Sequence, residues 1–197
     1  MSYGITKSNE IVIGYDAKVD APSPVNLTNH AYYNLAGEGR GLDIYSTELK
    51  LYSSAYAEVD INKIPTGKLL SAGNTPFDFK SPKPIGKDIK ALLSSGGYDH
   101  CFVVDGEPGK LRPFAEVYEP STGRYMKGFT TQPGVQFYTG NHISAMTGKN
   151  GSVYEKHSGF CLETQHFPDA PNRPEFPSAI FGPERDYQEK AVFAFDW

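Results

Sequence analysis

Short runs of alternating apolar and polar residues, separated by glycine and proline, make up most of the chain. In residues 10–19, Ile11 and Ile13 fall on one face, and residues 190–197 repeat the same alternation at the other end of the chain. A period of two is typical of strands that bury one face. The 20 glycines and 15 prolines lie largely between such runs, where they favour turns. We therefore predict an all-β fold, an antiparallel β-sandwich.

Further strands are predicted from the same pattern. They cover residues 47–59, 96–104, 112–118, 124–131 and 130–141. Pro65 and Gly67 predict a tight turn at residues 64–67. One short helix is expected at residues 86–93, where Ile89, Leu92 and Leu93 share a face. With 197 residues and no linker or internal repeat, the chain is expected to form a single domain, residues 1–197.

Charge and composition exclude several classes of function. The formal net charge is −4 and no block of lysine or arginine occurs, so a nucleic-acid or anionic membrane partner is not expected. No apolar run approaches the roughly 18 residues that span a bilayer. The first residues lack the basic-then-apolar pattern of a signal peptide, which predicts a cytoplasmic protein. Cys101 and Cys161 lie in apolar strand-like segments and are expected to be small core residues, not a disulfide or a metal pair.

Residues 25–35 are unusual for a core strand because Asn26, Asn29, His30 and Asn34 lie among apolar residues. Strand alternation would place Asn26 and His30 on the same side. Buried polar groups need hydrogen-bond partners, so a cluster of them indicates a site or a polar network.

Residues 159–171 begin as a strand and end in a loop. Phe160 and Leu162 are expected to point one way, and Cys161 and Glu163 the other. The prolines from Pro168 onward end the strand. This arrangement places the Glu163 carboxylate at the end of a rigid strand, where a functional group can be aimed. A surface glutamate on an edge strand is the alternative interpretation.

Four strand-associated patches therefore carry polar residues, around His30, Asp99, Gln132 and Glu163. Their spacing matches no metal-binding motif, no phosphate-binding glycine loop and no serine-nucleophile motif. A histidine with a glutamate can act as a general acid and base pair. The 13 tyrosines also suit a sugar-binding β-sandwich without chemistry, because a ring face packs on the apolar face of a sugar. Composition and spacing leave both possibilities open.

The same residues lie in motifs that resemble those of the aldose 1-epimerase family, also called galactose mutarotases. The motifs are NLTNHAYYNLAG at residues 26–37, GYDH at 97–100, TQPGVQFYTGN at 131–141 and HSGFCLETQ at 157–165. They occur in the family's order and span nearly the whole chain. The resemblance implies a large antiparallel β-sandwich that interconverts the α and β anomers of free aldohexoses such as glucose and galactose, without a cofactor or metal.

The resemblance also implies roles for individual residues. Glu163 matches the family's general base and His30 its general acid. Asp99 and Gln132 match positions that hold sugar hydroxyls, and Tyr32 lies in the stretch that lines the site.

The family's domain is longer on the N-terminal side, where it carries an Asn-Arg pair and a second histidine that contact the sugar. This chain is expected to lack those strands. His100 and His157 are expected to be structural or surface groups, and His166 is close enough to Glu163 in the sequence to line the rim of the pocket. Three alternatives follow: an active epimerase, a sugar-binding homologue without catalysis, or an incomplete piece. The chain is expected to be a monomer, or a homodimer formed through exposed sheet edges.

Overall fold

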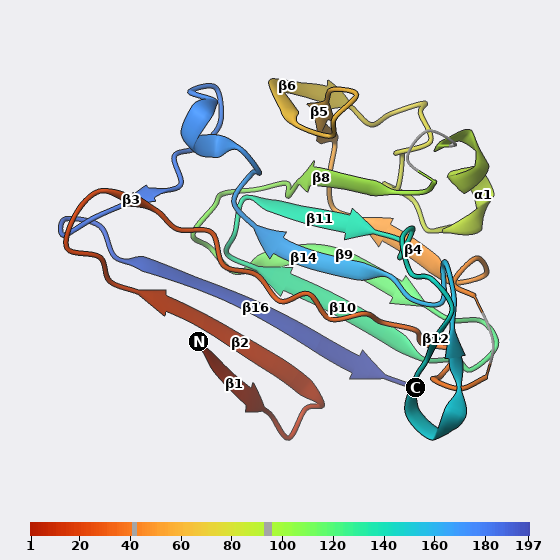
Figure 1. The fold of residues 1–197 in the computed structure, drawn as a ribbon. Helices are drawn as coiled ribbons and strands as arrows, with labels where there is room; N and C mark the ends of the chain where they lie inside the picture. The colour runs from red at the N-terminus through yellow and green to blue at the C-terminus, as the bar shows by residue number, and fades with distance from the viewer. Residues whose placement is uncertain (41–42, 93–95) are drawn as a thin grey trace.

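The computed structural model describes residues 1–40, 43–92 and 96–197, and two antiparallel sheets stacked face to face dominate this part of the chain (Figure 1). The first sheet has seven strands, in the order β1 (Ser2–Ile5), β2 (Glu10–Ala17), β16 (Tyr187–Asp196), β10 (Tyr125–Thr130), β9 (Arg112–Tyr118), β4 (Glu48–Leu51) and β7 (Lys83–Pro84). The second has five, in the order β14 (Cys161–Gln165), β11 (Gly134–Tyr138), β8 (Asp99–Val103), β5 (Ala55–Val59) and β6 (Pro65–Ser71). The predicted all-β sandwich is confirmed.

Smaller elements complete the fold. Two-residue strands pair as β3 (Ser23–Pro24) with β15 (Ile180–Phe181) and β12 (Met146–Thr147) with β13 (Val153–Tyr154). The helices are α1 (Gly86–Ile89) and the 3-10 turns Lys90–Leu92, Lys149–Gly151 and Ala170–Asn172. The expected helix at 86–93 is confirmed over residues 86–92, and Leu93 lies outside the described residues. Within the described ranges, every helix is too short to cross a membrane.

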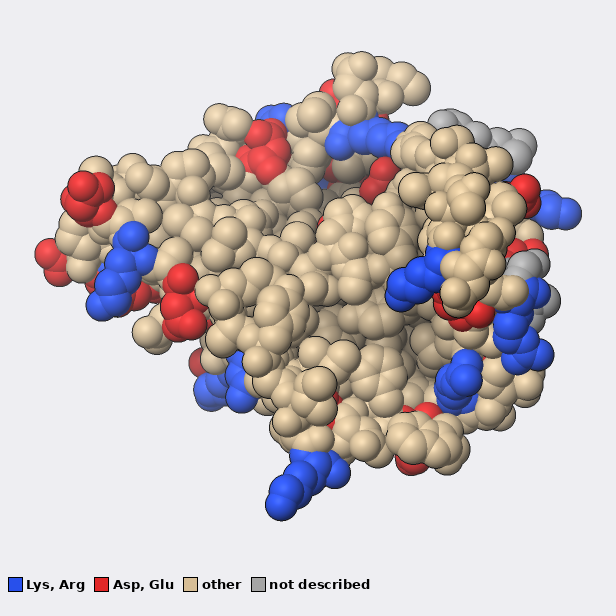
Figure 2. Space-filling view, turned by 60° about the horizontal axis from the view of Figure 1, so that its bottom comes forward, with Lys and Arg blue, Asp and Glu red and all other residues tan. Residues whose placement is uncertain are grey.

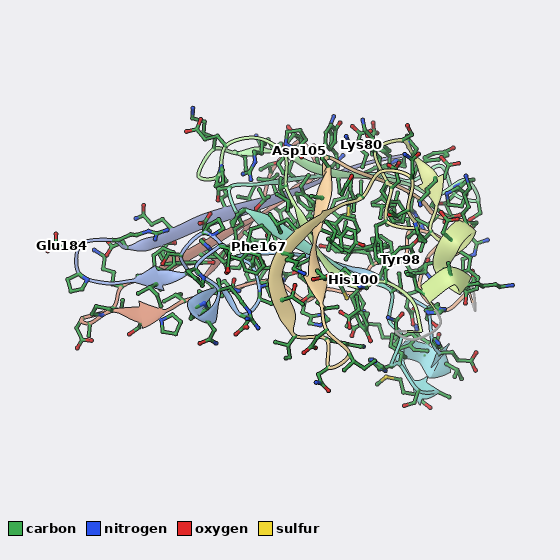
Figure 3. All side chains as sticks on the ribbon, turned by 90° about the horizontal axis from the view of Figure 1, so that it is seen from above. Lys80, Tyr98, His100, Asp105, Phe167 and Glu184 are labelled. Carbon is green, nitrogen blue, oxygen red and sulfur yellow. The ribbon has the colours of Figure 1, made fainter. Side chains whose placement is uncertain are left out.

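The main core lies between the two sheets and is rich in phenylalanine. Phe114 and Phe193 enter it from the seven-stranded sheet, and Phe102, Phe137 and Phe160 from the opposite side. Each of these side chains is at most 1% exposed. Full burial of one such side chain contributes about 1.5–3 kcal/mol. Figure 3 shows the packed interior from above, with the turn at Glu184 projecting at the end opposite the helix.

Strand alternation fixes the outer face of the five-stranded sheet. Leu162 belongs to the main core, as does Phe137 on the neighbouring strand. Cys161 and Glu163 therefore face away from the main core, on the outer side of the sheet, as the alternation predicted. Cys101 joins a second small core cluster as expected, whereas Cys161 is buried outside both clusters. Because β14 and β11 are paired with Gln136 opposite Glu163, Gln136 shares this outer face.

Arg112, at the start of β9, holds several loops together at one end of the sandwich. Its guanidinium donates hydrogen bonds at 3.0–3.4 Å to the backbone carbonyls of Val104, Asp105, Lys110, Thr130, Thr131 and Gln132. The side chain is almost completely buried, with the residue only 9% exposed. A planar group with five donors suits this convergence of carbonyls, and lysine would not replace it.

The chain reverses earlier than the turn predicted at residues 64–67. Asp60 accepts hydrogen bonds from the backbone N–H groups of Asn62 and Ile64, and Lys63 adopts a positive φ of 64°. Pro65 is the first residue of β6. The prediction was wrong because proline, which has no N–H to donate, is tolerated where a strand begins, and the Asp60 side chain supplies the turn.

Residues 25–35, here called the His30 segment, follow the edge of β14 without forming a regular strand (Figure 1). At one end, Asn26 and His166 exchange two hydrogen bonds of 3.0 and 2.9 Å. At the other end, Tyr33 and Phe160 exchange two backbone hydrogen bonds of 2.7 and 3.0 Å. The segment is thus fastened to β14 at both ends, and His30 lies between the two fastenings.

The asparagines of the His30 segment explain its irregular path. Asn29 accepts a hydrogen bond from the backbone of Ala31, and Asn34 donates to the carbonyl of Ser158. Asparagine side chains that bond to the backbone compete with a regular strand ladder. The asparagines therefore shape this segment. Of Asn26, Asn29, His30 and Asn34, only His30 lines the cavity described next.

Charged residues are mixed over the surface. On the face shown in Figure 2, lysine and arginine alternate with aspartate and glutamate around an uncharged, hollowed centre. This face offers no single-sign patch of the kind that tracks a phosphate backbone.

Candidate active site

An open cavity of about 370 Å³ lies on the outer face of the five-stranded sheet. Its lining comes from the His30 segment, β8, β11, β14 and the loops that follow β11 and β14. It consists of His30, Tyr32, Asp99, Gln136, Tyr138, His142, Glu163, Gln165 and Pro168. The structure thus brings together four of the five residues singled out in the sequence, namely His30, Tyr32, Asp99 and Glu163.

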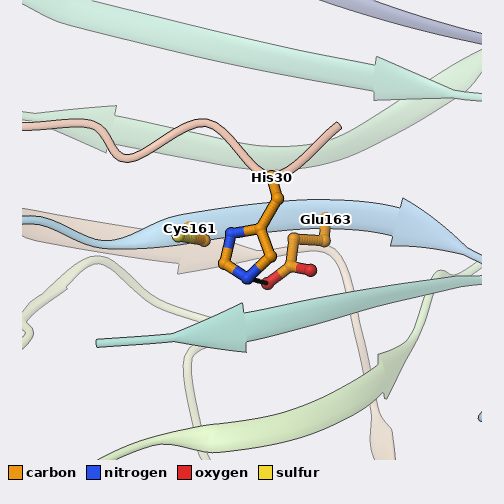
Figure 4. Close-up of side chains that lie close together, drawn as sticks. All are labelled: His30, Cys161 and Glu163. Carbon is orange, nitrogen blue, oxygen red and sulfur yellow. Dashed lines mark ion pairs between the residues drawn. The ribbon is translucent and has the colours of Figure 1, made fainter. Parts of the chain in front are cut away.

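His30 and Glu163 face each other in this cavity (Figure 4). His30 Nε2 lies 3.6 Å from Glu163 Oε1. The imidazole is half exposed, whereas the carboxylate is only 10% exposed. Burial raises the pKa of Glu163, nearby Asp99 raises it further, and His30 opposes the shift. A carboxylate with a raised pKa is a stronger base toward a bound hydroxyl than an exposed one.

Two tyrosines hold the imidazole of His30. Tyr32 stacks on it with ring centroids 5.2 Å apart and an angle of 20° between the planes. Tyr138 meets it edge-on at 6.2 Å. Aromatic contacts of these geometries stabilise a pair by about 0.5–1.5 kcal/mol. The ring is therefore presented toward Glu163 by packing as well as by charge.

Asp99 sits at the first position of β8, where its carboxylate receives two donors. Gln136 donates from Nε2 to Oδ1 at 2.8 Å, and Lys63 lies 3.3 Å from Oδ2. The Lys63 ammonium also lies 3.3 Å from Nε2 of His142. The turn between β5 and β6 thus carries a positive charge to the rim of the cavity, beside a carboxylate.

Gln132 does not reach the cavity. It is fully buried, and its Nε2 donates to the carbonyls of Thr164 at 3.0 Å and Leu27 at 3.3 Å. The hydroxyl of Tyr187 donates to its Oε1 at 3.3 Å. With both ends of its amide in use, Gln132 ties the His30 segment to β14 and is not placed to hold a sugar hydroxyl, which corrects the expectation from the motif.

Gln136 is the glutamine that faces the cavity, and sequence reasoning missed it. Its neighbours Val135 and Phe137 are fully buried in the core. The alternation of residues 134–138 therefore contained the signal, since a polar residue between two core residues must face outward. Tyr138 and His142 were also missed as lining residues.

The other histidines lie elsewhere. His166 is 4% exposed, pairs with Glu189 at 3.2 Å and does not line this cavity. His157 is buried between Tyr45 and the Gly96 carbonyl, consistent with a structural group. His100 packs against Phe77, with ring centroids 4.6 Å apart.

A second cavity, of about 1150 Å³, lies on the other side of Tyr32. Its wall includes Tyr33, Tyr125, Met146, Phe195 and Trp197. Neither His30 nor Glu163 lines it. The smaller cavity is therefore the candidate active site, despite its size.

One group of side chains at the candidate site has the chemistry of metal ligands. The nitrogen, sulfur and oxygen atoms of His30, Cys161 and Glu163 lie within 4.8 Å of one another. Their spacing along the sequence matched no metal motif because His30 lies far from Cys161 and Glu163 in the chain, although the latter two share β14.

The site places a buried carboxylate beside an imidazole on the outer face of an antiparallel β-sandwich. The protein is therefore a β-sandwich with a candidate acid and base pair. The family model for aldose 1-epimerase matches residues 1–194. The chain belongs to the aldose 1-epimerase family.

Individual relatives agree with this assignment. The chain is 44% identical over 188 residues to a galactose mutarotase of Rattus norvegicus, covering 94% of this chain and 54% of that protein. It is 34% identical over 200 residues to an aldose 1-epimerase of Escherichia coli K12, covering 99% and 57%. A crystal structure of an aldose epimerase homologue from C. elegans superimposes with a TM-score of 0.84 at 26% identity, covering 98% of this chain and 58% of that one. The chain thus spans little more than half the length of the curated relatives it matches.

Proposed function

We propose that the chain interconverts the α and β anomers of free aldohexoses, with Glu163 as general base and His30 as general acid. The observation that carries the proposal is the 3.6 Å separation of Nε2 and Oε1 in an open cavity. Anomer exchange requires two proton transfers at the oxygens bonded to a single carbon, C1. An acid and a base that serve two such oxygens must lie side by side, as these two do.

The reaction begins with a protonated His30 and an ionised Glu163. Glu163 takes the proton of the hydroxyl on C1, and the electrons of that O–H bond form the aldehyde C=O. The bond from C1 to the ring oxygen breaks, and its electron pair takes a proton from His30. Rotation about C1–C2 then presents the other face of the aldehyde. Ring closure reverses the roles, because neutral His30 removes the hydroxyl proton and protonated Glu163 returns a proton to the carbonyl oxygen.

The electrostatics of the cavity support these roles. Burial raises the pKa of Glu163, which favours its acceptance of a proton during ring opening. The adjacent positive form of His30 stabilises the ionised carboxylate before the reaction. A positioned proton transfer of this kind accelerates a reaction by about 10²–10⁴-fold.

Substrate contacts are proposed for Asp99, Gln136 and Tyr32. The two polar groups form one hydrogen-bonded unit at the cavity wall, with a 2.8 Å contact between them. Among the described residues, the buried Oε1 of Gln136 has no hydrogen-bond partner, so it keeps an unused acceptor at the cavity wall. Tyr32 is half exposed and offers a ring surface to the sugar. A cytoplasmic location and the oligomeric state stay predictions.

Polarimetry of freshly dissolved α-D-glucose or α-D-galactose tests the proposal. Wild-type protein is expected to accelerate relaxation, and Glu163→Gln to lower the protein-dependent rate by at least about 10²-fold. Glu184→Gln is the matched control, because that glutamate is exposed at the far end of the molecule. A wild-type rate equal to the buffer rate refutes catalysis by this chain. Calorimetric sugar binding without acceleration would instead favour the sugar-binding homologue.

A further inference from the structure

The thiol of Cys161 takes no part in the proposed chemistry, yet it lies beside both groups that do (Figure 4). Cys161 and Glu163 are two residues apart on β14 and point to the same side of the sheet. His30 approaches from the His30 segment, which is fastened to β14 on either side. Two ligands on one rigid strand and a third on a tethered segment form a preorganised set.

We propose that His30, Cys161 and Glu163 bind a zinc ion, and that this ion reversibly blocks the site. The zinc-binding part stands independently of the proposed function, and only the blocking part rests on it. One imidazole nitrogen, one sulfur and one carboxylate oxygen are each common zinc ligands. Three protein ligands leave a fourth position for water from the cavity.

The distances suit a small tetrahedral ion. Bonds of about 2.0–2.3 Å to nitrogen, oxygen and sulfur place two ligands of the same zinc ion roughly 3.3–3.7 Å apart. Nε2 of His30 and Oε1 of Glu163 already lie 3.6 Å apart, and one imidazole nitrogen, the Cys161 sulfur and a carboxylate oxygen lie within 4.8 Å of one another. A shift of about 1 Å closes the set. The half-exposed imidazole has room to make that shift, because it borders the cavity.

The ligand types and the local charge select the ion. Sulfur is a soft ligand that favours zinc and disfavours magnesium and calcium, which prefer oxygen. The cavity wall adds the carboxylate of Asp99 to that of Glu163, and Lys63 contacts only the former. With His30 neutral, as zinc binding requires, two carboxylates face one lysine, and a divalent cation enters a site with a net negative charge. On binding, the thiol proton and the proton of a charged His30 pass to solvent, and the thiolate and the neutral imidazole bond to the metal.

Zinc bound here would occupy the nitrogen and the oxygen that exchange protons with the sugar. The epimerase reaction would stop while the ion is bound and resume when a chelator removes it. Zinc and the sugar would thus compete for the same nitrogen and oxygen atoms.

Cobalt and zinc titrations of the full chain test binding without reference to activity. Cobalt(II) is expected to produce a sulfur-to-metal charge-transfer band that zinc abolishes by displacement. Cys161→Ala is expected to remove the band and to weaken zinc binding in calorimetry by at least about tenfold. Loss of a group that merely hydrogen-bonds to a metal ligand already lowers metal affinity by about 10–100-fold. Cys101→Ala is the matched control, a second buried free cysteine on the same sheet that lies outside the ligand group.

Two outcomes overturn the proposal. If Cys161→Ala and Cys101→Ala bind zinc as wild type does, with equal urea midpoints showing that both are folded, Cys161 is no ligand. If polarimetric rates of an active wild type are the same with saturating zinc and with chelator, the ion does not block the reaction. Should wild type show no epimerase activity, the cobalt band and the calorimetric difference still decide whether the metal site exists.

Discussion

Gln132 and Gln136 lie in one motif, but the same substitution is expected to affect different properties. At Gln132 it should lower stability, and at Gln136 it should raise the KM for the sugar. Gln132→Leu preserves side-chain shape but removes two donated hydrogen bonds and one acceptor in the interior. A net hydrogen bond contributes about 0.5–1.5 kcal/mol, and a buried partner left unsatisfied costs about 1–3 kcal/mol. Because Tyr187 also donates to the Leu27 carbonyl, only part of the network is orphaned. We therefore expect a loss of about 2–4 kcal/mol of unfolding free energy.

Gln136→Leu should leave stability within about 1 kcal/mol, because the Asp99 carboxylate keeps Lys63 as a partner and borders the cavity. Removal of the cavity-facing amide is expected to raise the KM for a hexose by roughly tenfold, the equivalent of about 1.4 kcal/mol. Urea unfolding monitored by fluorescence gives the first quantity, and polarimetry at several sugar concentrations gives the second. The assignment of the two glutamines is refuted if Gln136→Leu proves the more destabilising, or if Gln132→Leu raises KM without loss of stability.

Three further predictions concern the sandwich itself. Arg112→Met is expected to destabilise the protein by at least about 3 kcal/mol in urea unfolding, because the backbone carbonyls that accept from the guanidinium lose their donors. A change under about 1 kcal/mol contradicts this. Gly128→Ala places a Cβ 2.4 Å from Cζ of Phe114 and should cost about 1–3 kcal/mol, whereas Gly4→Ala meets nothing within 4 Å and should change stability little. Burial lowers the pKa of His100 to about 4, so below its unfolded pKa of about 6.5 the unfolded state binds a proton that the folded state refuses. Stability should thus fall by up to about 3 kcal/mol as the pH drops from 6.5 to 4, and His100→Gln should flatten that part of the pH profile.

The strands were largely predictable from the sequence because one face of each is buried. Residues 112–118 form β9 over their full predicted length, and the C-terminal strand extends three residues further back than predicted. Period-two alternation is a local property, and burial between two sheets imposes it directly. The turn at residues 64–67 failed since Pro65 and Gly67 fit a strand entrance as well as a turn.

The site was less predictable because its parts meet only through tertiary structure. His30 and Glu163 come from segments far apart in the chain, and no spacing rule links them. The residue types suggested a histidine and glutamate pair, and the family motifs assigned its roles to these two residues. The same motifs misplaced the glutamine, because Gln132 and Gln136 lie in one short motif. Gln132 precedes β11 and its amide is buried, whereas Gln136 lies within β11 and faces the cavity. The proximity of Cys161 to His30 has no local signal at all.

The two fastenings of the His30 segment imply an order of events during folding. The Asn26 side chain bonds to His166 across a separation of 140 residues. The candidate acid can therefore reach its partner only after most of the chain has left the ribosome. Closing so long a loop costs about (3/2)RT ln n, roughly 4 kcal/mol, before any contact rewards it. Contacts of this range slow folding. We therefore expect the nascent chain to stay incompletely folded during much of its synthesis, and His30 and Glu163 to come together among the last steps.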